Sequence, residues 1–242
     1  MSSKAEVLAV VPARGGSKGI PRKNLTKVHG RTLIDYACSV ASQCLTVSRA
    51  VITSDDREMG AEGLRAGADY FVERPEDLST DAATGADAWV HAWLDAEQKF
   101  GQLFDLSVLL QPTSPTRRVE DVEATIHRLV ATGVSAALTV SPVPKHFSPA
   151  KLLWVDDSGE LAPVLADAVP NRRRQDVPAA YWLNGHCYAV RRDTFLRDRV
   201  VIPRDAQAVV IDRPVANIDG PEDLRSAEEL LDPKFQGRSP AT

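Results

Sequence analysis

Two kinds of hydrophobic pattern alternate along the first two thirds of the chain. Short continuous apolar runs are typical of strands that are buried on both faces. They fall at 7–11, 50–53, 70–72, 106–110 and 136–140. Between them, apolar residues recur at helical spacing, over 33–44, up to Gly67, over 86–94 and over 119–130. This alternation predicts an α/β fold, a mostly parallel twisted sheet with helices on both faces.

Some details of these elements can also be predicted. Ser54 or Asp55 is expected to cap the helix that runs to Gly67, since short polar side chains satisfy the free N–H groups at a helix start. Trp89 and Trp93 lie at helical spacing and are expected in the core. Gly133 is expected to end the helix before the fifth strand.

The rhythm of strand and helix breaks between about residues 142 and 203. Short strand-like pieces at 152–154 and 187–190 stand among prolines and an arginine run at 172–174. A strand at 209–211 and a helix over 221–231 then close the pattern. We therefore expect one domain over 1–231 with an insertion at 142–203, followed by a flexible polar tail over 232–242.

The overall charge excludes some classes of partner. The 29 Lys and Arg against 33 Asp and Glu give a formal net charge of −4, which argues against a dedicated nucleic-acid binder. No apolar run approaches the roughly 20 residues of a membrane span, and the N-terminal segment lacks the pattern of a signal peptide. Cys38, Cys44 and Cys187 form no Cys-x-x-Cys pair. A cytoplasmic protein without membrane or nucleic-acid partners is expected.

The distribution of charge points to a different ligand. Residues 7–34 contain six basic side chains and no acidic one, so the rest of the chain carries −4 − 6 = −10. Most of these cations lie in the glycine-rich loop 12–24, directly after the first strand, where parallel sheets bind ligands. Backbone N–H groups in such a loop can cradle phosphate oxygens, and arginines and lysines can neutralise them. The spacing is neither a Walker loop nor Gly-x-Gly-x-x-Gly, so a solvated basic turn remains the alternative.

Several motifs occur in an order known from one family. The loop reads Pro-Ala-Arg-Gly-Gly-Ser-Lys-Gly-Ile-Pro-Arg-Lys-Asn, and Arg-Pro-Glu-Asp-Leu-Ser begins at residue 74. Gln-Pro-Thr-Ser-Pro begins at residue 111, Asn-Gly at 184, and Asp-Gly-Pro-Glu-Asp-Leu at 219. Over residues 6 to 231 the chain resembles the CMP-sialic acid synthetases, the acylneuraminate cytidylyltransferase family that acts on nonulosonic acids.

The resemblance implies a fold, a reaction and a set of site residues. The fold would be Rossmann-like, of the nucleotide-diphospho-sugar transferase type, with an inserted arm that makes a homodimer. The enzyme would transfer CMP from CTP to the anomeric hydroxyl of an acidic, sialic-acid-like sugar and release pyrophosphate. The implied nucleotide-binding residues are Arg14, Ser17, Lys18, Lys23, Asn24, Arg74, Ala83, Thr84 and Gln111. The implied sugar-site residues are Gln111, Lys151, Arg174, Asn184 and Tyr188. Arg14 and Lys18 would take up charge that builds on the pyrophosphate.

The resemblance also implies a magnesium ion on Asp219, and here the chain departs from the family. The family commonly places a second acidic residue two positions earlier, where this chain has Asn217. An amide oxygen can bind a metal but cannot neutralise its charge. We expect Asp219 and the substrate phosphates to hold the metal, with Asn217 as a secondary ligand. A catalytically silent, nucleotide-sensing homologue is the alternative that Asn217 raises.

The expected acceptor differs from N-acetylneuraminate. Sialate-specific members have an arginine where this chain has Trp182, and their aromatic pair has no match near Val200 and Val201. A different nonulosonate or another acidic acceptor is therefore expected. An octulosonate-type cytidylyltransferase is a second choice. A nucleotide-sugar-using glycosyltransferase is disfavoured because Gln111-Pro112 stands where an Asp-x-Asp motif would follow the central strand.

Overall fold

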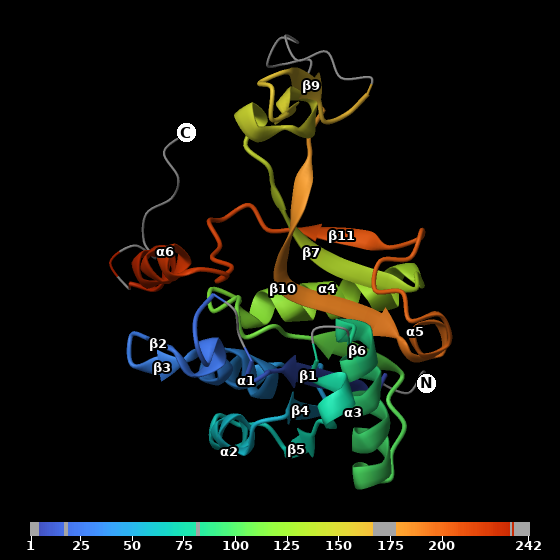
Figure 1. The fold of residues 1–242 in the computed structure, drawn as a ribbon. Helices are drawn as coiled ribbons and strands as arrows, with labels where there is room; N and C mark the ends of the chain where they lie inside the picture. Colours follow the sequence, from blue (N-terminus) through green and yellow to red (C-terminus); the bar gives the residue numbers. More distant parts are fainter. Residues whose placement is uncertain (1–4, 17–18, 81–82, 167–177, 233, 235–242) are drawn as a thin grey trace.

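A computed structural model describes residues 5–16, 19–80, 83–166, 178–232 and 234. Within these residues the main sheet has seven strands in the order β11-β7-β10-β6-β1-β4-β5 (Figure 1). The strands are β1 (Val7–Pro12), β4 (Arg49–Ser54), β5 (Tyr70–Glu73), β6 (Leu106–Leu109), β7 (Ala136–Pro142), β10 (Tyr181–Arg191) and β11 (Gln207–Val210). β10 runs antiparallel to β6 and β7, and the other pairings are parallel. The predicted mostly parallel sheet is confirmed.

Helices cover both faces of this sheet, as predicted. They are α1 (Leu33–Gln43), α2 (Arg57–Arg65), α3 (Gly85–Phe100), α4 (Val119–Thr132), α5 (Arg192–Asp198) and α6 (Pro221–Leu231). Val7, Ala9 and Val11 of β1 belong to the hydrophobic cluster under α1, α2 and α4, whereas Leu8 and Val10 belong to the one under α3 and α5. A strand buried on both faces needs this continuous apolar run. Trp89 and Trp93 are in the second cluster, which confirms their predicted place in the core.

The start of α2 bears on the site. Asp56 caps α2, its carboxylate accepting the N–H groups of Glu58 and Met59, so the predicted cap at Ser54 or Asp55 is wrong. Asp55 Oδ1 instead accepts the Gly15 N–H at 2.9 Å, and Ser54 Oγ accepts the Asp56 N–H at 3.0 Å. Asp55 thus contacts the glycine-rich loop, and Asp56, one position later, caps the helix.

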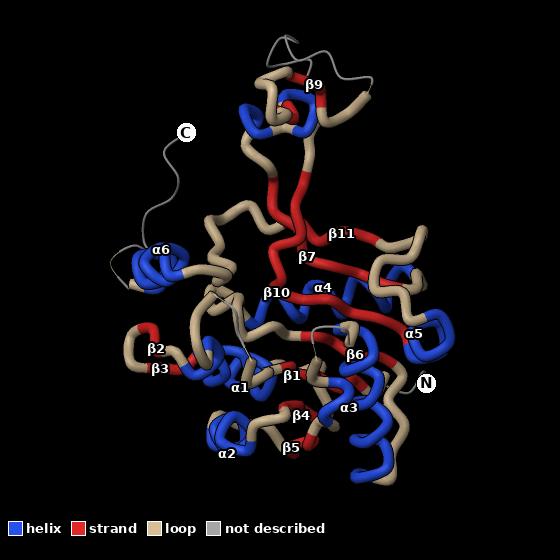
Figure 2. Tube along the Cα trace, viewed as in Figure 1, coloured by secondary structure: helices blue, strands red, loops and turns tan. Residues whose placement is uncertain are grey.

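The region that breaks the strand–helix rhythm is shorter than predicted. The chain leaves the sheet after β7, forms the small hairpin of β8 (Leu153–Val155) and β9 (Leu161–Pro163), and returns in β10 (Figure 2). β10 then pairs with both β6 and β7 in the middle of the sheet, and α5 packs on the main core. The projection therefore lies between Pro142 and Tyr181, and the rest of the 142–203 segment belongs to the sheet and its cover.

Loops from distant parts of the sequence meet at one edge of the sheet. The parallel strands β1, β4, β6, β7 and β11 all end there, and the antiparallel β10 begins there. A hairpin of β2 (Lys27–Val28) and β3 (Arg31–Thr32) follows the first loop, after a 3-10 turn at Lys23–Leu25. The carboxyl edge of a parallel sheet is where ligands bind in such folds. No helix in the described parts of the chain is long and apolar enough to cross a membrane.

Candidate active site

Two adjoining cavities lie at this carboxyl edge. The first, called the central cavity below, has a volume of about 230 Å³ and is lined by Pro12, Ala13, Arg14, Lys23, Asn24, Arg74, Gln111, Pro112 and Thr113. The second, the lateral cavity, also has about 230 Å³ and is lined by Arg14, Arg74, Leu78, Ser79, Thr80, Ala83, Thr84, Gly85 and Ala88. Arg14 and Arg74 line both. The described residues predicted to bind a nucleotide therefore share one continuous wall.

Arg74 lines both cavities. Its side chain is buried and donates to the main-chain oxygens of Thr53 at 2.8 Å and Ala13 at 3.3 Å. Burial lowers the pKa of Arg74, and the nearby Arg14 lowers it further, against the opposing effect of Asp55. A guanidinium held this way keeps positive charge next to the glycine-rich loop. It also fixes the ends of β1 and β4 relative to each other.

Lys23 joins the loop to the far end of the chain. Its Nζ donates to the Ile218 main-chain oxygen at 2.7 Å and lies 3.3 Å from Asp219 Oδ1. The Lys23 side chain is only 13% exposed, whereas that of Asp219 is 82% exposed. A Cβ added to Gly19 would come within 2.6 Å of the Asp219 main-chain oxygen, so the loop and the backbone of Asp219 are in close contact. The predicted phosphate loop and the predicted metal carboxylate therefore meet.

The basic loop is not uniformly available to a ligand. Arg22 pairs with Asp56 at 2.6 Å and Glu58 at 2.9 Å, both at the start of α2. Asn24 donates through Nδ2 to the Arg14 main-chain oxygen at 3.3 Å, which ties the end of the loop to its beginning. Ser17 and Lys18, also predicted to bind the nucleotide, lie outside the described residues. Thr84 caps α3, accepting the Asp87 N–H at 3.2 Å, beside Ala83 in the lateral cavity.

Gln111 can approach β10 closely because the strand has a glycine, Gly185, at the point of contact. Gly185 has a φ of +73°, a conformation that favours glycine. A Cβ there would meet Ser114 Oγ at 2.8 Å and Gln111 Oε1 at 2.9 Å, with Asn217 Oδ1 at 3.8 Å. The Asn217 oxygen is buried and has no hydrogen-bond partner among the described residues. Gln111 and Asn217, both singled out in the sequence, therefore both lie beside the α-carbon of Gly185.

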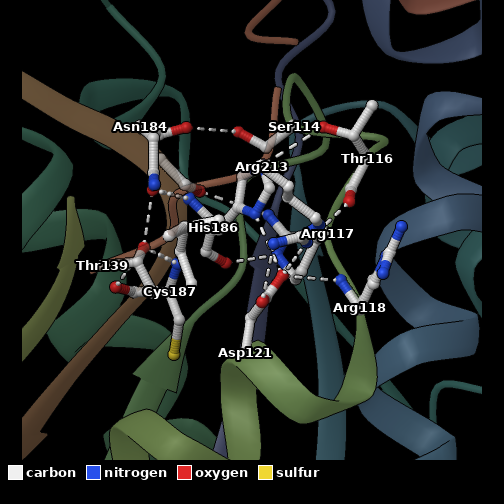
Figure 3. A network of polar contacts seen from close by, with 12 residues as sticks. Ser114, Thr116, Arg117, Arg118, Asp121, Thr139, Asn184, His186, Cys187 and Arg213 are labelled. Atoms are coloured by element: carbon white, nitrogen blue, oxygen red, sulfur yellow. Dashed lines mark hydrogen bonds and ion pairs between the residues drawn. The ribbon is translucent and has the colours of Figure 1, made fainter. Parts of the chain in front are cut away.

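Beneath these residues lies a buried polar network that sequence reasoning missed (Figure 3). Arg117, fully inside the protein, donates to the main-chain oxygens of Gln111, Gly185 and His186. Burial lowers its pKa to about 10. Asp121 accepts from His186 and Arg213, which outweighs the opposite effect of burial and lowers the pKa of Asp121 to about 2. The one sequence signal is a charged pair, Arg117 and Asp121, at i and i+4 around a helix start.

The predicted sugar-site residues that the structure describes do not all lie together. Asn184 is fully buried. Its amide is hydrogen-bonded to β7, accepting from Thr139 Oγ1 at 2.7 Å and donating to Ser141 Oγ at 3.0 Å. Tyr188 is half-buried against the cluster under α3, and burial raises its pKa. Lys151 lies on the projection, in a 3-10 turn at Pro149–Lys151. Arg174 lies outside the described residues.

Asp219 and Asn217 carry oxygen atoms of the kind that a divalent cation binds. In the described parts of the chain no three His, Cys, Asp or Glu side chains gather to hold a metal by themselves. Mg²⁺ suits a sparse protein donor set, because it prefers carboxylate and other oxygen ligands and completes its shell with waters and substrate phosphates. The exposed Asp219 carboxylate and the buried Asn217 amide oxygen, which has no partner among the described residues, are oxygen ligands of that kind.

Comparison with known proteins agrees with this geometry. The family model described as cytidylyltransferase matches residues 8–204. CMP-N,N'-diacetyllegionaminic acid synthase of Legionella pneumophila is 28% identical over 93% of this chain and 96% of its own length. N-acylneuraminate cytidylyltransferase of Streptococcus agalactiae is 31% identical over 79% of this chain and 45% of its own length. A solved CMP:2-keto-3-deoxy-manno-octonic acid synthetase complexed with CTP covers 94% of this chain with a TM-score of 0.69 and 18% identity.

The fold and the matched sequence define a nucleotidyltransferase. The chain belongs to the cytidylyltransferase family. The predicted resemblance and enzyme class are thereby confirmed.

Proposed function

We propose that this protein transfers the CMP group of CTP to the anomeric hydroxyl of a nonulosonic acid. One observation carries the proposal: Arg14, Lys23, Asn24, Arg74 and Gln111 line a single cavity at the carboxyl edge of the sheet. The relatives named after CMP-legionaminic acid and acylneuraminate support the acceptor class, because the first of them spans nearly the whole chain. An octulosonate-type acceptor is supported only by the similarity of fold to a synthetase that is 18% identical in sequence.

The transfer of CMP accounts for the basic side chains that line the central cavity. The anomeric oxygen forms a bond to the α-phosphorus of CTP, the bond from that phosphorus to the bridging oxygen of the β-phosphate breaks, and pyrophosphate leaves. A triphosphate repels an oxygen nucleophile, so neutralising charge and aligning the attack are the main tasks. Arg14 and Lys23 would bind the triphosphate, and Lys18 would join them. The lateral cavity, with Arg74, Ala83 and Thr84, would hold cytosine and ribose.

We propose that Mg²⁺ is required and that Asp219 and Asn217 hold it together with the phosphates. When bound, the metal would supply charge neutralisation at the α-phosphate. Lys23 already pairs with Asp219, so the lysine would orient this carboxylate toward the phosphates. Gln111, beside Gly185 and Asn217, would lie where nucleotide and sugar meet and would orient the acceptor hydroxyl.

We also propose that two copies of the chain associate through the projection. Its hairpin exposes large apolar side chains: Trp154 and Val155 are each 65% exposed and Leu161 is 64% exposed. A second copy would cover this apolar surface, which is costly to leave in water. Light scattering should therefore report a dimer, and Trp154→Glu should yield a monomer. A wild-type monomer would contradict the proposal. A cytoplasmic location is proposed with it, because CTP is supplied there.

The function is tested by pyrophosphate release from CTP and Mg²⁺ with a panel of acceptors. The panel contains N,N'-diacetyllegionaminate, pseudaminate, N-acetylneuraminate and 2-keto-3-deoxy-octonate. We expect release with a nine-carbon acid other than N-acetylneuraminate, and much less with the eight-carbon acid. Tight CTP binding without release from any acceptor would favour a silent nucleotide-sensing protein.

A further inference from the structure

Three segments of the chain meet around His186, which the proposed mechanism does not use. His186 lies in β10 with none of its surface exposed. Its Nδ1 is 3.1 Å from Asp121 Oδ2 in the first turn of α4, and its Nε2 is 3.2 Å from Thr116 Oγ1. Figure 3 shows the imidazole between these partners. Arg117 and Arg213 are the other charged groups beside it.

The Asp121 carboxylate determines where the imidazole carries its proton. An ionised carboxylate can only accept, so His186 Nδ1 carries the proton and donates it to Asp121. In a neutral ring Nε2 then has no hydrogen, so it accepts the hydroxyl hydrogen of Thr116. Thr116 Oγ1 in turn accepts the main-chain N–H of Ala216 at 3.0 Å. Burial lowers the pKa of His186, against the opposing hydrogen bond to Asp121, in agreement with a neutral ring.

The same segment is anchored a second time through Asp121. Arg213 binds Asp121 Oδ1 at 3.0 Å and donates to the Thr116 main-chain oxygen at 3.1 Å. Arg213 and Ala216 are thus tied to Asp121 and Thr116, and His186 bridges these two anchors. Ile218 continues the attachment by donating its N–H to the Thr113 main-chain oxygen at 2.8 Å.

We propose that His186 is a positioning residue which, through the hydroxyl of Thr116, holds the 213–219 segment so that Asp219 meets the substrate phosphates. The proposal rests on the function proposed above, because the role of Asp219 does. The hydrogen bonds that run from His186 through Thr116 are called the relay below. The relay ends at the Ala216 N–H, three residues before Asp219. Groups that orient a functional carboxylate from behind typically change activity by about 10- to 100-fold when removed.

Thr116 offers a matched pair of variants. Thr116→Val keeps the shape of the side chain but removes the hydroxyl, whereas Thr116→Ser keeps the hydroxyl. We expect Thr116→Val to lower kcat by about tenfold, leave the calorimetric Kd for CTP unchanged, and accelerate hydrogen exchange at the Ala216 amide. Thr116→Ser should match the wild type in all three. Equal losses in both variants, or a wild-type kcat in Thr116→Val, would overturn the proposal.

His186 offers a second pair in case Thr116→Val does not fold. Asparagine places its amide nitrogen near the position of Nδ1 and keeps the contact with Asp121, whereas glutamine reaches toward the position of Nε2 and keeps the contact with Thr116. We expect the kcat loss and the faster Ala216 exchange in His186→Asn, and near wild-type values in His186→Gln. If His186 merely fills space and pairs with Asp121, the larger losses should occur in His186→Gln and the smaller ones in His186→Asn. That result would refute the relay.

Failure of this relay can be told apart from failure of the proposed function. Hydrogen exchange at Ala216 needs no substrate, so it tests the relay even if no acceptor releases pyrophosphate. Unchanged exchange at Ala216 in both Thr116→Val and His186→Asn would overturn the relay alone. Absence of pyrophosphate release in the wild type would contradict the proposed function alone.

Discussion

Lys23 and Asp219 lie 196 positions apart in the sequence and form an ion pair of 3.3 Å at the edge of the central cavity. The same lysine also binds the Ile218 main-chain oxygen at 2.7 Å. One side chain of the glycine-rich loop therefore fixes the segment that carries the candidate metal ligand. The lysine is mostly buried and the carboxylate mostly exposed, so the lysine is the more enclosed member of the pair.

We predict that Lys23→Gln raises the KM for CTP by about tenfold, since one charge-assisted contact to phosphate is worth on the order of 1.5 kcal/mol or more. Steady-state kinetics at saturating acceptor measure the effect. Arg22→Gln is the matched control, because Arg22 faces Asp56 and Glu58 and not the cavity. Equal increases of KM in the two variants would contradict the assignment of Lys23.

Asp219 and Asn217 are predicted to differ in importance. Asp219→Ala should abolish magnesium-dependent turnover, because it removes the only charged member of the pair. Asn217→Ala should remain active, with a higher Mg²⁺ concentration at half activation. Pyrophosphate release over a Mg²⁺ titration measures both. Similar activity in the two variants would show that Asp219 is not the principal ligand.

Gly185→Ala should lower both stability and kcat. The methyl group would enter a left-handed backbone position and would press on Ser114 and Gln111. Gly133→Ala is the control, since Gly133 has a similar φ of +70° but, apart from its chain neighbours, no described residue has an atom within 4 Å of an added Cβ. We expect both variants to lose about 1 kcal/mol of unfolding free energy from backbone strain. A loss of kcat is expected for Gly185→Ala alone, and unchanged kcat there would argue against a role for Gln111.

Acid should weaken the fold through the buried network. Burial lowers the folded-state pKa of His186 below 6.5, so below about pH 6.5 the unfolded chain binds more protons there than the folded chain. The free energy of unfolding should therefore fall as the pH drops through this region. A carboxyl whose pKa falls from 3.8 to about 2 on folding, as that of Asp121 does, stabilises the folded state by about 2 kcal/mol at neutral pH. This stabilisation is lost as the pH falls from about 4 toward 2.

Urea unfolding of the wild type and His186→Gln at pH 8, 7, 6 and 5 isolates the histidine. The stability advantage of the wild type should shrink as the pH falls, because glutamine does not titrate. A difference that stays constant from pH 8 to pH 5 would contradict the buried, neutral state of His186.

Much of the fold follows from local pattern. The helix Pro221–Leu231 and the strand from Val7 were predicted nearly residue by residue, because their apolar spacing is regular and their ends carry clear start and stop residues. The place of β10 was not predicted. Its bulge between Leu183 and Tyr188 interrupts the pattern, and hydrophobic periodicity does not reveal which strands become neighbours.

The site also contains residues that the sequence predicts and residues that it does not. Loop residues such as Arg14 and Asn24 were identified because they follow directly on a predicted strand and match a family motif. The network of Asp121, His186 and Arg213 was missed, since its members lie 65 and 92 positions apart and none carries a motif. Asn184 shows the converse. It belongs to a family motif, but its side-chain amide is hydrogen-bonded within the sheet.

Analysis of the reaction products tests the central claim most directly. Wild-type protein, CTP and Mg²⁺ are incubated with each nine-carbon acid, and the mixture is followed by ³¹P NMR and mass spectrometry. The account predicts one CMP-linked sugar for each pyrophosphate released with at least one acceptor, and none when ATP replaces CTP. Release of pyrophosphate without a CMP-linked sugar, or equal turnover of ATP, would contradict it.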